Sequence, residues 1–196
     1  MASFLSRLFG AGQSSLQLRG ISVEVDNSRP DIRTDDVLSR LDESLALIEQ
    51  YAPIRFRHLQ RDIRAIRVER YPCRGAFMPV DRTVMTELTF LNRRDITAAP
   101  VASSILHEGV HARVHAFRVN VVSATGNYDF GERDMAREER LCRRAELAFG
   151  MSLPRALGAP VIERAMESLA LDDESVAPVV DWNVAMERTR QVDRGE

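Results

Sequence analysis

The sequence predicts an α+β fold, with short strands confined to the first part of the chain. Alternating apolar and β-branched residues mark strands only before residue 92. Beyond that point the apolar residues recur at helical spacing. Strands mixed with helices, followed by helices alone, are typical of α+β proteins. The length of 196 residues suits one domain with a buried core.

The first part of the chain is expected to form a small mixed or antiparallel sheet with two helices. The strands are expected over residues 16–25, 64–71, 76–80 and 84–91. The helices are expected over residues 35–51 and 54–61. Gly20 interrupts the first strand pattern, and Pro53 follows the first helix.

The second part of the chain is expected to be helical. A long helix should begin near Asp95 or Thr97, because either residue can cap it and Pro100 fits its first turn. This helix is expected to end near Phe117. A connection over residues 119–131 precedes the remaining helices, which are expected over residues 132–150, 155–170 and 177–191. We therefore divide the chain into a flexible N-terminus (1–15), a main domain (16–153) and a helical extension of that domain (154–196).

Composition argues against several classes of protein. The chain is 44% hydrophobic and 29% charged, as in ordinary globular proteins, and its net charge of −2 does not favour a nucleic-acid partner. No stretch approaches the roughly 18 apolar residues of a stable membrane span. Cys73 and Cys142 are far apart and form no CxxC pair, so a disulfide framework is not expected and a cytoplasmic location is.

The segment SSILHEGVHARVH, residues 103–115, contains a motif with metal-binding chemistry. His107, Glu108 and His111 follow the pattern His-Glu-x-x-His. On a helix, His107 and His111 share one face and can direct two imidazoles at one Zn²⁺ ion. Glu108 lies about 100° around the helix, which suits a general base beside the metal. Composition gives such a motif by chance on the order of once in a few hundred chains of this kind.

His115 belongs to the same segment but not to the same predicted site. It lies two helical turns beyond His107, about 12 Å along a straight helix. No glycine breaks the helix between His111 and His115. We therefore expect His115 to be a surface histidine or a residue that supports the site from outside.

A third protein ligand is expected from the helix that follows the motif. If the two helices pack antiparallel, a residue about seven positions into the returning helix comes level with His111. That position is Glu138 or Glu139, and the geometry alone leaves both open. Cys142 is an alternative ligand, although a small packing residue is the preferred interpretation.

These residues resemble the gluzincin group of zinc metallopeptidases, which combine HExxH with a distant glutamate. The resemblance covers the motif helix, the following helix and the preceding strand, and it implies a zincin-like fold. Gluzincins usually have a small residue three positions after the ligand glutamate, which favours Glu139, followed by Cys142, over Glu138, followed by Leu141. The acidic residue frequent at the fourth position is replaced by Arg143, so Glu146 is the candidate to support a ligand histidine.

The resemblance implies a hydrolase that cleaves a peptide or protein substrate with zinc on His107, His111 and Glu139. Glu108 would act as general base. Tyr128, or else Arg113, is the candidate for a second electrophilic group. The strand over residues 84–91 is either an edge strand that pairs with an extended peptide or an ordinary sheet strand.

Two other interpretations of the sequence remain. The first is a catalytically inactive zincin-like domain that binds or regulates a protein. The second is a metal-free helical interaction module.

Overall fold

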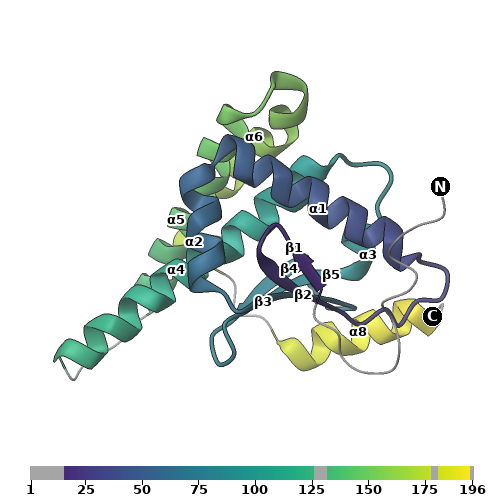
Figure 1. The fold of residues 1–196 in the computed structure, drawn as a ribbon. Coiled ribbons are helices and arrows are strands. Elements are labelled where there is room, and N and C mark those ends of the chain that lie inside the picture. The colour runs from purple at the N-terminus through teal and green to yellow at the C-terminus, as the bar shows by residue number, and fades with distance from the viewer. Residues whose placement is uncertain (1–15, 126–131, 178–180, 195–196) are drawn as a thin grey trace.

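The fold is a mixed five-stranded sheet packed with helices (Figure 1). The computed structural model describes residues 16–125, 132–177 and 181–194. The N-terminal segment 1–15, predicted to be flexible, lies outside these ranges. The strands are β1 (Leu16–Leu18), β2 (Ile21–Val25), β3 (Ala65–Glu69), β4 (Gly75–Met78) and β5 (Thr83–Glu87). This arrangement confirms the predicted α+β class.

The first predicted strand is a hairpin of two strands. β1 and β2 pair antiparallel, with Leu18 opposite Ile21. The two residues between them, Arg19 and Gly20, both have positive φ. Such a pair closes a tight hairpin turn, and glycine adopts this conformation without strain. The break expected at Gly20 is therefore the reversal of the chain.

The strand order is β1-β2-β3-β5-β4, so β1 and β4 form the two edges of the sheet. β2, β3 and β5 are parallel to one another, whereas β4 pairs antiparallel with β5. β5 therefore lies inside the sheet and all five of its residues are buried. Of the two alternatives for the strand in residues 84–91, the structure supports the ordinary sheet strand, because β4 covers the side of β5 that would otherwise be an edge.

The segment after β5 also differs from the prediction. Residues 84–91 were expected to be one strand, but the strand ends at Glu87 and Leu88–Leu91 form the short helix α3. The carboxylate of Glu87 accepts a hydrogen bond of 2.7 Å from the backbone N–H of Phe90. This cap favours a helical turn at the point where the apolar pattern alone would extend the strand.

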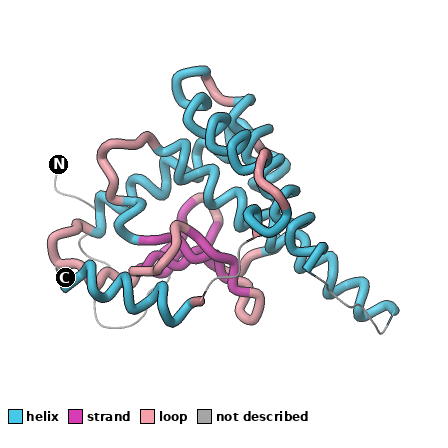
Figure 2. The backbone as a smooth tube through the Cα atoms, turned by 180° about the vertical axis from the view of Figure 1, so that it is seen from behind, coloured by secondary structure: helices cyan, strands magenta, loops and turns pink. Residues whose placement is uncertain are grey.

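Helices cover both sides of the sheet (Figures 1 and 2). The helices α1 (Thr34–Tyr51) and α2 (Pro53–Asp62) occur close to the positions predicted for them. Both pack against α4 (Ala98–Thr125), and α1 buries an apolar face that includes Leu41, Leu45 and Ile48. The helix α8 (Trp182–Arg194) runs along the opposite side of the sheet.

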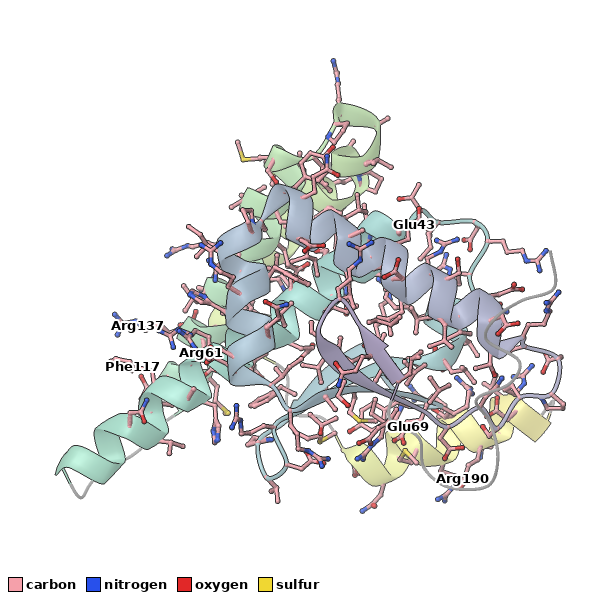
Figure 3. The ribbon with its side chains drawn as sticks, in the orientation of Figure 1. Glu43, Arg61, Glu69, Phe117, Arg137 and Arg190 are labelled. Atoms are coloured by element: carbon pink, nitrogen blue, oxygen red, sulfur yellow. The ribbon has the colours of Figure 1, made fainter. Side chains whose placement is uncertain are left out.

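Helix α4 is longer than predicted. It continues past Phe117 to Thr125, through residues that were expected to form a connection. This last part extends away from the sheet (Figure 1), and Phe117, labelled in Figure 3, is 63% exposed there. The remaining helices are α5 (Glu132–Ser152), α6 (Arg155–Leu169) and α7 (Asp173–Val176). Within the described ranges, no helix has the length and apolar character needed to cross a membrane.

Candidate metal centre

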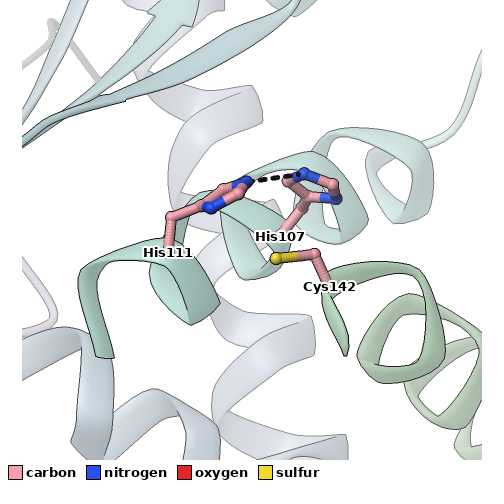
Figure 4. Close-up of side chains that lie close together, drawn as sticks. All are labelled: His107, His111 and Cys142. Atoms are coloured by element: carbon pink, nitrogen blue, oxygen red, sulfur yellow. Dashed lines mark hydrogen bonds between the residues drawn. The ribbon is translucent and has the colours of Figure 1, made fainter. Parts of the chain in front are cut away.

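Helix α4 presents the two histidines of the motif on one face. The Nε2 atoms of His107 and His111 lie 3.1 Å apart. Figure 4 shows the two rings side by side, with Cys142 of α5 next to them. His107 is only 6% exposed, so this pair of imidazoles lies largely out of water. One turn of helix thus directs two metal-binding nitrogen atoms at one small volume.

Helix α5 places the carboxylate of Glu139 against both of these nitrogen atoms. One carboxylate oxygen lies 3.3 Å from Nε2 of His107, and the other lies 3.1 Å from Nε2 of His111. The contacts of Ser103 with Glu146, and of His111 with Glu138, show that α4 and α5 run antiparallel. The residues that antiparallel packing brings level with His111 are therefore Glu138 and Glu139.

The other ring nitrogen of His107 is held by a buried carboxylate. Nδ1 of His107 lies 2.6 Å from Glu146, which is 3% exposed. Glu146 also accepts hydrogen bonds from Ser103 Oγ at 2.9 Å and from the guanidinium of Arg143 at 2.6 Å. A carboxylate on Nδ1 fixes the proton there and leaves Nε2 available to a metal.

His111 has the same arrangement with a different carboxylate. Its Nδ1 lies 2.7 Å from Glu138, and Glu138 forms an ion pair of 2.5 Å with Arg118. Glu138 and Glu139, the two candidates for the third metal ligand, thus occupy two different places. Glu139 faces the Nε2 atoms, whereas Glu138 holds the far side of one ring.

These carboxylates favour positive charge on the imidazole pair. Burial would lower the pKa of His107, but hydrogen bonds with Glu139 and Glu146 outweigh it and raise the pKa to about 10. The pKa of His111 is also raised against its burial, by Cys142 and two glutamates. Burial would raise the pKa of Glu139, but the two histidines lower it well below its usual range. A proton or a metal cation can supply the positive charge that this site stabilises.

The donor atoms fit a metal ion. His107, His111 and Cys142 form a group whose ligand atoms all lie within 4.8 Å of one another, and such a group can hold a metal. The triangle of the two Nε2 atoms and Glu139 is tighter, with the separations of 3.1 to 3.3 Å given above. Ligands about 2.1 Å from a tetrahedral zinc ion lie roughly 3.4 Å apart. The distances from Glu139 to the two Nε2 atoms match this value, and Cys142 is the alternative third donor.

Glu108 lies on another face of α4, directly beside the edge strand β4. It is 8% exposed, and its burial raises the pKa of its carboxyl group. A Cβ atom added to Gly75 of β4 would lie only 3.0 Å from Ser104 Oγ and 3.2 Å from the Glu108 side chain. The backbone of β4 therefore passes very close to this carboxylate, and a side chain at position 75 would require Ser104 and Glu108 to shift by a few tenths of an ångström.

A cavity of about 890 Å³ opens onto the histidines and Glu108. Its walls come from β4 and the turns around it, from α4 and α5, and from α6 and α7. His115 lines this cavity and packs against Phe77 of β4, with ring centroids 5.6 Å apart. His115 therefore faces the cavity but takes no place among the converging Nε2 atoms.

The two residues considered as electrophilic groups have different outcomes. Arg113 points away from this centre, since its guanidinium lies 3.7 Å from Asp62 and it does not line the cavity. Tyr128 lies outside the described residues. Sequence reasoning missed the contacts of Glu138 with Nδ1 of His111 and of Ser103 with Glu146. Ser103 precedes His107 by one helical turn, so its spacing was a signal that could have indicated a shared face.

Comparisons of the chain with protein-family models, with curated proteins and with solved structures gave no significant match.

Proposed function

We propose that the protein is a zinc-dependent peptidase, with zinc held by His107, His111 and Glu139. The observation that carries the proposal is the meeting of two Nε2 atoms and one carboxylate within 3.3 Å, while both Nδ1 atoms are bound by other carboxylates. Metal-binding histidines characteristically donate their second ring N–H to a carboxylate or carbonyl. An ordinary ion pair of a histidine and a glutamate does not require this double arrangement.

The position of Glu108 supports hydrolysis rather than metal storage. When bound, zinc supplies a Lewis acid that polarises a carbonyl group and acidifies water. Glu108 would accept a proton from the attacking water and then donate it to the leaving nitrogen. Its burial raises its pKa, and a raised pKa helps a carboxylate perform both transfers near neutral pH.

The edge strand β4 supports a peptide as substrate. β4 pairs with β5 along one edge only, so its other edge has no strand partner in the sheet. Residues 73–77, which include part of β4, line the cavity beside Glu108. An extended peptide can add to such an edge by backbone hydrogen bonds. The scissile bond would then lie between β4 and the two histidines.

The proposal is tested by measuring zinc per chain and peptide hydrolysis together. The parent should hold about one zinc per chain, whereas His107→Ala and Glu139→Gln should hold little. Glu108→Gln should keep its zinc and lose roughly 10²- to 10⁴-fold in hydrolysis. Glu167→Gln, an exposed carboxylate on α6, is the matched control and should change neither property. Normal hydrolysis by Glu108→Gln would refute the mechanism, and zinc without any hydrolysis would favour a non-catalytic protein-binding domain.

A further inference from the structure

The charges that line the cavity are unevenly paired. Three of its carboxylates, those of Glu138, Glu139 and Glu146, contact the histidines. Two of its arginines bind these carboxylates: Arg118 binds Glu138, and Arg143 binds Glu146. Arg164, on α6, also lines the cavity. In contrast to the other two, it forms no ion pair and donates no hydrogen bond to any residue that the structure describes.

The surroundings of Arg164 suit a ligand group rather than solvent alone. Arg164 is partly buried, and Val176 and Ala177 line the same cavity. Val176 is only 5% exposed. A partly buried guanidinium in a cavity that apolar side chains also line is less well hydrated than one on an open helix, so an anionic partner gains more from binding it.

Arg74 also lines the cavity and forms no ion pair with a described residue, but it is differently placed. The guanidinium of Arg74 lies over the ring of Phe90, 5.2 Å from its centroid. This contact already satisfies part of its charge. Arg164 is therefore the cation of the cavity with the least compensation within the described chain.

We infer that Arg164 binds a carboxylate of the substrate, and that the protein acts on peptides with such a group near the scissile bond. This inference rests on the proposed peptidase function. A peptide that lies along β4 would pass the histidines inside the cavity that Arg164 also lines, so a nearby substrate residue can reach Arg164. The guanidinium fork matches a carboxylate through two parallel hydrogen bonds. The carboxylate can come from an acidic side chain or from the C-terminus of the peptide.

The test uses binding as well as cleavage, so that it does not depend on hydrolysis. Three fluorescent peptides of otherwise identical sequence serve as probes. One has an internal Glu and an amidated C-terminus, one has Gln and a free C-terminal carboxylate, and one has Gln and an amide. Their affinities are measured by fluorescence anisotropy with the full-length, zinc-loaded Glu108→Gln protein, and their kcat/KM values with the parent.

One of the two carboxylate peptides should bind about 10- to 100-fold more tightly than the neutral peptide, as expected for one charged pair. Arg164→Ala should remove this preference without changing affinity for the neutral peptide, and Arg164→Lys should retain part of it. Arg155→Ala, an exposed arginine on the same helix, is the matched control and should bind like the parent.

The pattern of preference identifies the source of the carboxylate. Preference for the internal Glu indicates an acidic side chain, and preference for the free C-terminus indicates the terminal carboxylate. Equal affinity for all three peptides, no binding of any of them, or a preference that survives Arg164→Ala would overturn the inference. Binding with the expected preference but without cleavage by the parent would refute the peptidase proposal and leave the role of Arg164 intact.

Discussion

Replacing Glu146 by Gln should weaken metal binding although Glu146 is not a proposed ligand. Glu146 accepts hydrogen bonds from Nδ1 of His107, from Ser103 and from Arg143, and it is 3% exposed. The amide keeps the shape of the side chain but removes the charge that holds the proton on Nδ1. The Nε2 atom of His107 then becomes a poorer donor to a metal.

The expected magnitude follows from the role of such supporting carboxylates. Their loss usually weakens metal binding by about 10- to 100-fold, which corresponds to roughly 1.4 to 2.8 kcal/mol. Folding should be affected as well, because Arg143 loses its buried partner, and this costs about 1 to 3 kcal/mol. The variant should therefore fold with a lower melting temperature and hold zinc less tightly.

The assay is competition for zinc between the protein and a chromophoric chelator, with thermal melting to confirm that each variant is folded. Glu167→Gln, exposed on α6, provides the same chemical change away from the site and should leave zinc affinity unchanged. A folded Glu146→Gln protein with the zinc affinity of the parent would show that the contact with His107 does not support a metal ligand.

Three further predictions concern the rest of the molecule. Gly158→Ala should destabilise the fold by about 1 to 2 kcal/mol, because the added Cβ would lie 2.2 Å from the carbonyl oxygen of Gly150. The higher helix propensity of alanine offsets only about 1 kcal/mol of this cost. An unchanged melting temperature would contradict this prediction. Arg70 donates hydrogen bonds to Asp193 that hold the pKa of this carboxyl below its usual range, so the pair stabilises at neutral pH and is lost as the pH falls through that lowered pKa. The free energy of unfolding measured in urea should therefore be about 1 kcal/mol lower for Asp193→Asn than for the parent at pH 7. This difference should become progressively smaller below about pH 4, and a difference that persists in acid would exclude this cause. Burial raises the pKa of the Cys73 thiol to about 11, so iodoacetamide at pH 8 should alkylate it far more slowly than an exposed cysteine, as measured by mass spectrometry, and rapid labelling would contradict the burial.

Local patterns identified much of the helical framework and the residues gathered at the candidate centre. The spacing of apolar residues predicted α1 and α2 closely, because amphipathic helices leave a periodic record in the sequence. The spacing of His107 and His111 placed both on one face of a helix for the same reason. Antiparallel packing of two helices with equal rise per residue directed attention to Glu138 and Glu139, which the structure brings to His111.

Tertiary structure alone assigned different places to these two glutamates. Glu138 and Glu139 are neighbours in the sequence with the same chemistry, and their different contacts depend on how α5 is rotated against α4. The local sequence pattern does not predict the strand order either. β4 and β5 both have the pattern of a short apolar strand, although β5 is interior and β4 is an edge. The cavity beside Glu108 depends on this strand order and on the packing of α6 and α7. The sequence by itself therefore determined which chemical groups the helix α4 carries, because helical periodicity is local. Only the tertiary structure decided which groups face them, because the rotation of one element against another is set by contacts between residues far apart in the chain.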